Sequence, residues 1–268
     1  GWHPSLLPDQ TLAADCVDVV VKGQGEDAFL EIVQHIEAGE SLQGIPGVGY
    51  KQDGRLMFNV PRELKPIREL PPKAYHLANF DAYQRVCGRR WAMYTSSLAC
   101  PYNCAYCTND GVYGRKWNAL DAEQVVEETT DLVSRYGLSL LWIVDDNFLV
   151  DRARGIDIAR GFIESGLKFE WCIQTTANFL LRSSDEDVRL LRQSGLTRVF
   201  IGAESGSDDV LRSVNKVRFQ GTNVLHQVAE KCHNAHIRCT FSLIFALPDE
   251  TQADQRQTIA MIRDIKGR

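Results

Sequence analysis

The feature that most limits the fold is a repeat of short apolar runs and amphipathic segments that begins at residue 91. The apolar runs predict strands at residues 91–97, 139–144, 169–175, 198–203 and 238–247. The amphipathic segments predict helices at residues 121–136, 151–165 and 185–194 and from residues 207, 222 and 250. This alternation predicts a parallel sheet, and right-handed crossovers with helices on one side curl it into all or part of a (β/α) barrel. We expect an α/β fold with five barrel strands.

The segment at residues 121–136 illustrates how these helices are defined. Asp121 is a candidate N-cap, and Gln124 stands where a capping box needs its second member. The apolar stripe is expected to be buried, and Gly137 ends the helix. The stripe consists of Val125, Val126, Thr129, Leu132 and Val133.

The first 75 residues follow a different pattern. Residues 18–22 predict a strand, Gly23-Gln24-Gly25 a turn, and residues 26–39 a helix with Phe29, Ile32, Val33 and Ile36 on one stripe. Residues 47–60 predict a hairpin, because Asp53-Gly54 supplies the positive φ angles of a tight turn. Residues 61–75 hold four of the nine prolines, which predicts a linker. We expect two domains, residues 1–75 and residues 76–268.

Polar residues follow the predicted barrel strands repeatedly. The carboxyl ends of the strands in such a barrel meet at one rim, where the chemistry of these folds is placed. The sequence therefore predicts a polar rim made of Asp145, Asp146, Gln174, Thr175, Glu204, Ser205, Asp249 and Glu250.

A loop with three cysteines follows the first barrel strand. Cys100, Cys104 and Cys107 form a CxxxCxxC pattern in which three thiolates can hold one compact inorganic centre. A four-iron cluster held by three cysteines keeps one iron open to a ligand with nitrogen and oxygen donors. The alternative is a structural zinc site, which normally takes four Cys or His ligands, with Cys87 as the nearest spare thiol.

With the aromatic Tyr106 before its last cysteine, this loop resembles the signature of the radical S-adenosylmethionine (SAM) superfamily. The resemblance implies a [4Fe–4S] cluster on Cys100, Cys104 and Cys107, SAM on its open iron, and reductive cleavage of SAM to a 5′-deoxyadenosyl radical. It places Tyr106 near the adenine of SAM. It also places Asp145 or Asp146 beside the SAM ammonium, where many members have Gly-Gly-Glu. The alternative is that these acids cap the helix near Asp151 or are solvated.

Further SAM contacts follow from the same resemblance. The segment from Ile201 to Ser207 resembles the fourth-strand segment of the family, so Glu204 and Ser205 are expected near the ribose or amino-acid end of SAM, and Lys216 is expected to pair with the carboxylate. Thr175 is a further candidate SAM contact. The alternative for Lys216 is that it is a solvated charge on the surface. Residues 243–251 resemble the fifth-strand Gly-Leu-Pro-Gly-Glu-Thr segment, with Ala246 and Asp249 in place of both glycines.

The N-terminal residues resemble the second half of the cobalamin-binding domain that precedes the barrel in one subgroup. The resemblance implies the C-terminal half of a doubly wound domain, with Gly23 and Gly25 near the cobalamin tail. The alternative is that these glycines serve the turn geometry alone. The histidine segment that ligates cobalt in that subgroup is not found, and the chain stops after the fifth strand and its helix. We therefore expect a fragment cut at both ends.

The composition of the chain limits the kinds of partner that it is expected to bind. A net charge of −5 without a dense Lys/Arg cluster argues against nucleic acid. Apolar stretches such as residues 138–144 are far shorter than the roughly 20 residues of a membrane helix, and no signal peptide is recognised. The sequence predicts a cytoplasmic protein. Eight cysteines are too sparse for a disulfide scaffold, and four of them are expected to be buried core residues, namely Cys16, Cys172, Cys232 and Cys239.

The leading functional hypothesis is a cobalamin-dependent radical SAM methyltransferase. It would act on a small-molecule or lipid-like substrate with an external donor of the flavodoxin or ferredoxin type. One alternative is a cobalamin-linked cyclase, oxidation or rearrangement catalyst similar to the anaerobic magnesium-protoporphyrin ester cyclase. An alternative of another class is a non-catalytic metal-binding scaffold. No catalytic side chain is assigned.

Overall fold

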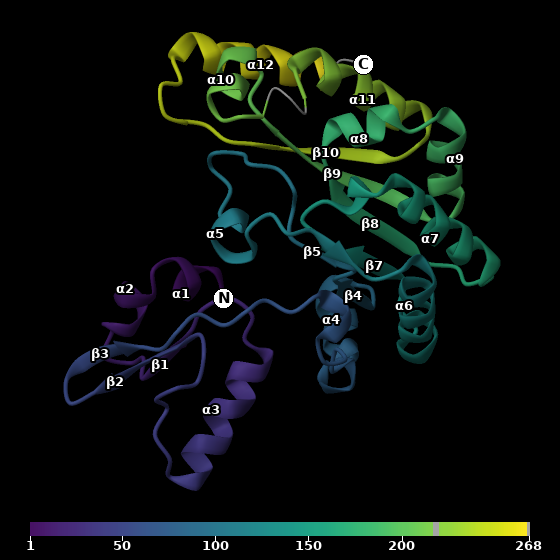
Figure 1. Cartoon of the computed structure of the whole chain (residues 1–268). Coiled ribbons are helices and arrows are strands. Elements are labelled where there is room, and N and C mark those ends of the chain that lie inside the picture. The colour runs from purple at the N-terminus through teal and green to yellow at the C-terminus, as the bar shows by residue number, and fades with distance from the viewer. Residues whose placement is uncertain (217–219, 267–268) are drawn as a thin grey trace. The chain divides into compact units, whose positions relative to one another are not determined.

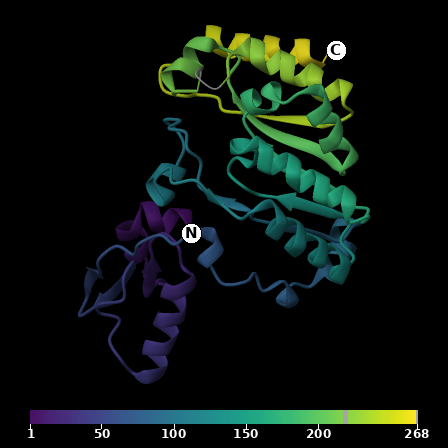
Figure 2. The same ribbon diagram turned by 45° about the vertical axis from the view of Figure 1, so that its right-hand side comes forward.

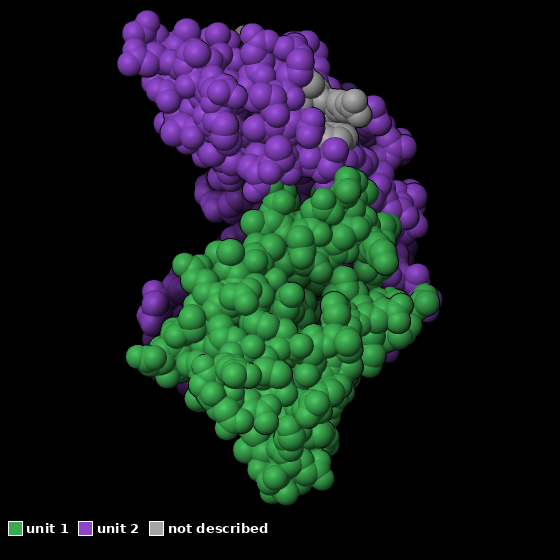
Figure 3. All heavy atoms as spheres, turned by 60° about the vertical axis from the view of Figure 1, so that its left-hand side comes forward, with its two compact units in different colours: residues 1–73, 99–101, 107–118 green, residues 74–98, 102–106, 119–268 purple. Residues whose placement is uncertain are grey.

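The computed structural model describes residues 1–216 and 220–266, which form two compact units shown in different colours in Figure 3. The first unit contains Gly1–Lys73 together with Ala99–Pro101 and Cys107–Asn118. The second contains Ala74–Leu98, Tyr102–Tyr106 and Ala119–Arg268. Among the described residues, no helix combines the length and the apolar character that a membrane crossing needs.

The first unit is built on a three-stranded antiparallel sheet in the order β1-β2-β3. The predicted hairpin is confirmed, because β2 and β3 pair around Asp53 and Gly54, whose φ angles are +50° and +73°. The strands are β1 (Val19–Val21), β2 (Val48–Gln52) and β3 (Arg55–Phe58). The helices are α1 (Trp2–Leu6), α2 (Pro8–Leu12), α3 (Glu26–Ala38), the 3-10 turn η1 (Ile67–Glu69) and α5 (Asn109–Tyr113).

Helix α3 forms where the sequence predicted it, but only Ile32 of the predicted apolar stripe is buried and Val33 is half-buried. Ala28 and Ile32 are the buried residues of the helix and pack with Ile45, Val48 and Tyr50. Phe29 and Ile36 are 67% and 61% exposed. The packing of α3 against the small sheet decides which face of the helix is buried. Because apolar residues lie at several positions around the helix, its sequence pattern was compatible with burial of either of two faces. Cys16 is also exposed, contrary to its expected burial.

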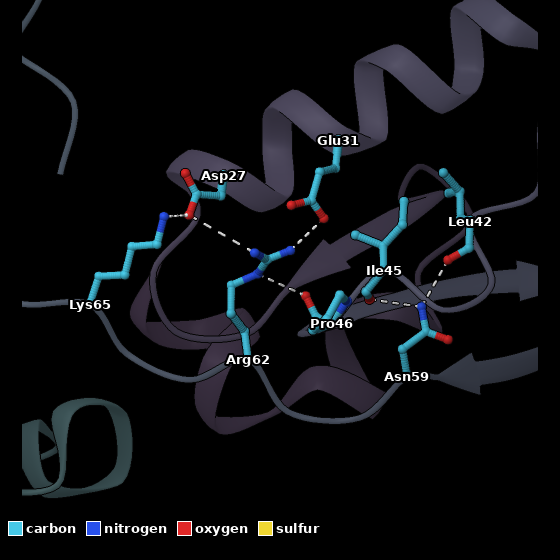
Figure 4. A network of polar contacts seen from close by, with 8 residues as sticks. All are labelled: Asp27, Glu31, Leu42, Ile45, Pro46, Asn59, Arg62 and Lys65. Carbon is cyan, nitrogen blue, oxygen red and sulfur yellow. Dashed lines mark hydrogen bonds and ion pairs between the residues drawn. The ribbon is translucent and has the colours of Figure 1, made fainter. Parts of the chain in front are cut away.

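A polar network joins α3 to the segment that follows β3 (Figure 4). Arg62 donates to Glu31 Oε2 over 2.5 Å and to the carbonyl oxygen of Pro46 over 3.1 Å. Lys65 Nζ lies 2.5 Å from Asp27 Oδ2, and this hydrogen bond, ahead of the nearby Arg62 charge, lowers the pKa of Asp27. These contacts hold the start of the proline-rich segment against its own unit.

The second unit contains the predicted five-stranded parallel sheet. Its strand order is β10-β9-β8-β7-β4, and each neighbouring pair is parallel. The partial-barrel prediction is confirmed, since the sheet strands follow one another in space as they do in sequence. They are β4 (Trp91–Tyr94), β7 (Leu140–Ile143), β8 (Glu170–Thr175), β9 (Leu196–Glu204) and β10 (Arg238–Leu243). The short strands β5 (Ser97–Leu98) and β6 (Asn118–Ala119) lie outside it.

Helices cover one face of this sheet, and Figures 1 and 2 show α6, α7 and α9 along it. Strand residues on that face, such as Leu141, Ile143, Val199 and Ile201, have no exposed surface. The longer helices are α6 (Ala122–Tyr136), α7 (Arg152–Glu164), α9 (Asp185–Gln193), α11 (Thr222–Asn234) and α12 (Gln252–Lys266). The shorter helical elements are η2 (Tyr75–Leu77), α4 (Phe80–Cys87), η3 (Phe148–Val150), α8 (Ala177–Arg182) and α10 (Asp208–Ser213).

The start of α6 corrects one detail of the sequence analysis. Asp121 is the N-cap residue, but its side chain makes no capping hydrogen bond. Gln124 donates instead to Glu128 Oε1 on the next turn, over 2.8 Å. The predicted capping box is therefore wrong, because its second member has a better partner one turn further along the helix. The end of the helix is as predicted, with Gly137 in the left-handed region.

Candidate functional site

The carboxyl ends of the parallel strands carry a set of buried polar residues. Asp145 and Asn147 follow β7, Thr175 ends β8, and Glu204 ends β9. Parallel strands end at the same edge of the sheet, so these residues belong to one rim. Four side-chain atoms that follow β7, β8, β9 or β10 are buried without a hydrogen-bond partner among the described residues, namely Asn147 Nδ2, Thr176 Oγ1, Gln220 Oε1 and Glu250 Oε1. Buried polar groups of this kind are rare in folded proteins and fit a rim that receives a polar ligand.

The cysteine loop leaves the sheet after β4 and β5. Cys100 and Cys104 are partly buried and Cys107 is exposed, and none of the three is in a disulfide. In the part of the chain that the structure describes, no three His, Cys, Asp or Glu side chains form a preformed metal-binding group. Three accessible thiols fit an iron–sulfur cluster by their chemistry, and binding of such a centre commonly orders its own ligands.

Tyr106, Glu204 and Lys216 form a buried polar cluster in the second unit. The Tyr106 hydroxyl donates to Glu204 Oε1 over 2.7 Å, and Lys216 Nζ lies 3.2 Å from the same oxygen. The ammonium of Lys216 is also 5.9 Å from the centre of the Tyr106 ring. Burial raises the pKa of Tyr106, and the neighbouring Glu204 and Cys104 raise it further. Lys216 is only 6% exposed, so the solvated alternative for this residue is wrong.

The backbone around Glu204 is specialised for this arrangement. Glu204 has a φ angle of +63°, a left-handed conformation that is uncommon for a residue with a side chain. A Cβ atom on Gly202 would collide with Glu204 Oε1, so the absence of a side chain at residue 202 makes room for the carboxylate. The end of β9 therefore turns the Glu204 carboxylate back toward Lys216.

The structure separates the two acids that follow β7. Asp145 is fully buried, and both of its oxygens accept hydrogen bonds from Ser96 and Ser97. Asp146 is exposed. Neither residue caps α7, because Asp151 is the N-cap and accepts from the Arg154 amide. Asp145 is thus bound within the protein, and a SAM contact of Asp146 stays a prediction.

Two further predicted residues point into the protein. Thr175 donates to Asn147 Oδ1 over 3.0 Å, which leaves the Asn147 amide nitrogen as a buried donor without a partner among the described residues. Ser205 contacts Thr258 of α12, with 3.2 Å between the two hydroxyl oxygens. Gly206 lies so close to Thr258 that a Cβ there would be 2.5 Å from its Cα. Ser205 and Gly206 therefore contact α12 and help to hold it in place.

The fifth-strand segment keeps a glycine-like backbone without the glycines. Ala246 and Asp249, which replace them, have φ angles of +60° and +65°. The Ala246 amide donates to Glu250 Oε2 over 2.6 Å, and this contact helps to hold the turn. Although both glycines are replaced, the backbone at these two positions thus keeps the left-handed conformation that glycine favours.

In the first unit, Gly23 and Gly25 lie between β1 and α3. Gly23 has a φ angle of +79°, and its amide donates to Ser5 Oγ over 2.9 Å. Gly25 is the N-cap residue of α3. Between them, Gln24 exchanges two hydrogen bonds with the backbone of Lys65. The turn geometry accounts for Gly23, and a role toward cobalamin stays a prediction for both glycines.

Sequence reasoning missed Ser96, Ser97, Asn147 and Arg154. The two serines and Asn147 carry no pattern that distinguishes them from loop residues. Arg154 did carry a signal, because it lies in the first turn of a helix that has no acidic residue there. Helix N-termini normally favour acidic residues, so a basic one in the first turn suggests a specific partner.

Comparison with known proteins identifies the class that this fold and loop define. A sequence model described as "Radical SAM superfamily" matches residues 94–262, which is more than half of the chain. The chain belongs to the radical SAM superfamily, as its cysteine loop predicted.

Three known proteins are similar to this chain over most of its length. An uncharacterised methyltransferase of Pyrococcus horikoshii is 28% identical over 99% of this chain and 57% of its own length. The anaerobic magnesium-protoporphyrin IX monomethyl ester cyclase of Synechocystis is 22% identical over 75% of this chain and 40% of its own. The structure of the radical SAM methyltransferase TsrM from Kitasatospora setae, with tryptophan and a SAM analogue bound, superposes with a TM-score of 0.80, 16% identity and coverage of 99% and 53%.

The structural likeness covers both units of the chain. TsrM has also been solved with cobalamin and a [4Fe–4S] cluster, and that structure covers 99% of this chain with a TM-score of 0.78. The N-terminal unit is thus part of the shared fold. The chain spans between 40% and 57% of the lengths of these proteins.

Proposed function

We propose that this chain is the cofactor-binding part of a cobalamin-dependent radical SAM enzyme, most specifically a C-methyltransferase. The observation that carries the proposal is the three-cysteine loop after the first strand of a parallel partial barrel, in a chain that belongs to the radical SAM superfamily. The Pyrococcus and Kitasatospora proteins, both called methyltransferases, support the choice of reaction.

In this proposal Cys100, Cys104 and Cys107 hold a [4Fe–4S] cluster, and SAM binds at the rim. When bound, the reduced cluster supplies the electron that cleaves SAM. Asp146, which is exposed after β7, is proposed to accept hydrogen bonds from the ammonium group of SAM. Glu204 and Lys216 present opposite charges at the end of β9. The amide nitrogen of Asn147, which has no hydrogen-bond partner among the described residues, is proposed as a donor on the same rim.

The whole protein is proposed to act on a small molecule in the cytoplasm and to take electrons from a flavodoxin or ferredoxin type of donor. Cobalamin is proposed to bind with the help of the first unit, because the structural likeness to a cobalamin-containing enzyme extends over that unit. The similarity to the ester cyclase keeps a cobalamin-linked cyclase as the second candidate.

Anaerobic reconstitution tests the proposal. The wild-type chain should take up about four irons and four sulfides, and the longer protein should form 5′-deoxyadenosine only with a reductant. Cys104→Ala should lose the cluster and the product, whereas Cys87→Ala, an exposed cysteine outside the loop, should keep both. One zinc per chain without sulfide would overturn the proposal. Retention of cobalamin by the longer protein tests the N-terminal assignment separately.

A further inference from the structure

Asp145 is a fully buried carboxylate that accepts side-chain hydrogen bonds from one short segment, Ser96 and Ser97. Its Oδ1 accepts from the Ser96 amide over 2.6 Å, and its Oδ2 accepts from the Ser96 and Ser97 hydroxyls over 2.6 and 2.7 Å. These are short, charge-assisted hydrogen bonds. The end of β7 is thereby joined to the residues that follow β4.

Arg154 of α7 holds the same segment from another side. Its Nη2 donates to the carbonyl oxygen and the hydroxyl of Ser96 over 3.0 and 2.8 Å, and its Nε donates to the Leu120 carbonyl oxygen over 2.7 Å. Burial lowers the pKa of Arg154, and the charge of Asp145 opposes that shift. Ser96 is therefore bonded on its amide, its carbonyl and its hydroxyl by two buried residues of opposite charge.

The position of Ser96 in the chain gives this network its consequence. Ser96 and Ser97 follow Tyr94, the last residue of β4, and only Leu98 and Ala99 separate Ser97 from Cys100. Ala99 has a φ angle of +66°, so the chain turns sharply between the anchored serines and the first cysteine. The network anchors the chain directly before the cysteine loop begins.

We propose that Asp145 and Arg154 are positioning residues that hold Ser96 and Ser97 so that Cys100 enters the cluster site in one orientation. This inference rests on the proposed function, since it concerns the same cysteine loop. It assigns Asp145 to the support of the loop rather than to SAM, and it leaves Asp146 as the acid at the rim.

A purely structural role is the competing explanation. Replacing a buried, hydrogen-bonded charged residue lowers stability by itself, because its former partners are left unsatisfied. Residues that orient metal ligands, by contrast, typically change metal affinity by about 10–100-fold when they are replaced. The two roles therefore differ in whether the loss falls on unfolding or on cluster retention.

The test compares Asp145→Asn, Ser97→Ala and Ser97→Thr in the 268-residue chain after anaerobic reconstitution. Asp157→Asn, an exposed acid on α7 that pairs with Arg160, is the matched control. Each protein is measured for iron and sulfide content, for the rate of iron loss to a chelator, for the electron paramagnetic resonance spectrum of the reduced cluster, and for its unfolding midpoint.

We expect Ser97→Ala and Asp145→Asn to lose iron about 10-fold faster than wild type and to alter the spectrum. Ser97→Thr, which keeps the hydroxyl donor, should restore the wild-type rate, and Asp157→Asn should match wild type. If Ser97→Ala retains its cluster as wild type does, the positioning role is wrong even where its unfolding midpoint falls. If wild type itself takes up no cluster, the proposed function fails instead.

Discussion

The hydroxyl of Tyr106 donates to Glu204 Oε1 over 2.7 Å, although the two residues are 98 positions apart in the sequence. Tyr106 stands between two cysteines of the loop, and Glu204 ends β9. This contact ties the middle of the cysteine loop to the fourth strand of the sheet. Removal of this contact should lower the stability of the folded chain and should weaken the binding of the proposed ligand at the rim.

Tyr106→Phe removes only the hydroxyl of this contact. Because hydrogen bonds to charged groups contribute about 1.5–3 kcal/mol, we expect the free energy of unfolding to fall by that amount. Urea denaturation followed by circular dichroism measures the change. Tyr83→Phe is the control, since the Tyr83 side chain is exposed and contributes ring contacts alone. Equal stability of the two variants would contradict the buried hydrogen bond.

Lys216→Met leaves Glu204 buried without its cation. The two side chains are 8% and 7% exposed, so the unpaired carboxylate is expected to cost about 3–5 kcal/mol of unfolding free energy. Lys168→Met, at an exposed lysine, should change it by less than about 0.5 kcal/mol. Adding Glu204→Gln to Lys216→Met should recover much of the loss, because a neutral amide needs no cation. A double variant no more stable than Lys216→Met would argue against the pair.

Gly202→Ala tests the room made for the Glu204 carboxylate. The new Cβ would collide with Glu204 Oε1 and displace it from Lys216. Overpacking of this kind typically costs about 1–3 kcal/mol. Gly221→Ala meets only ordinary van der Waals contact, with its nearest neighbour 3.4 Å away, and serves as the control. Thermal unfolding of both variants decides whether the space at residue 202 is needed.

Tyr75 should make stability depend on pH at the alkaline end. Burial, together with the nearby Glu128, raises the pKa of Tyr75 to about 12 from 10.0. The folded state therefore favours the protonated phenol. The resulting stabilisation is complete below pH 10.0 and is lost as the pH rises through about 12.

The comparison with Tyr75→Phe isolates this effect. The difference in unfolding free energy between wild type and the variant should shrink as the pH rises from 10.0 toward about 12. Tyr94 is a coupled neighbour, because Tyr75 helps to raise its pKa, so the comparison measures the effect of Tyr75 together with that smaller effect on Tyr94. A difference that stays constant over this range would show that Tyr75 ionises as easily in the folded chain as in the unfolded one.

Much of the fold was predictable because its signals are local. The parallel sheet follows from apolar runs separated by helical segments, and the hairpin follows from Asp53-Gly54. The buried face of α3 was not predictable, since Phe29 and Ile36 are as apolar as the residues that pack. Only the small sheet decides which face it covers.

The site was predictable to the extent that its residues form a motif. The three cysteines and the acids at the ends of β7, β9 and β10 are visible in the sequence. The burial of Asp145 is not, because its partners Ser96 and Ser97 lie 49 and 48 positions away and have no distinctive pattern. The contact between Ser205 and Thr258 was not predictable for the same reason, since the two residues are 53 positions apart in the chain.

The left-handed backbone at Ala246 and Asp249 has a consequence for engineering. A non-glycine residue in this conformation costs roughly 1 kcal/mol, but its side chain also restricts the chain when it is unfolded. Glycine at either position would relieve the first effect and enlarge the second, so the net gain would be small. The loop after β10 can therefore accept glycine without a large change in stability, and Ala246 and Asp249 restrict its backbone more than glycines would.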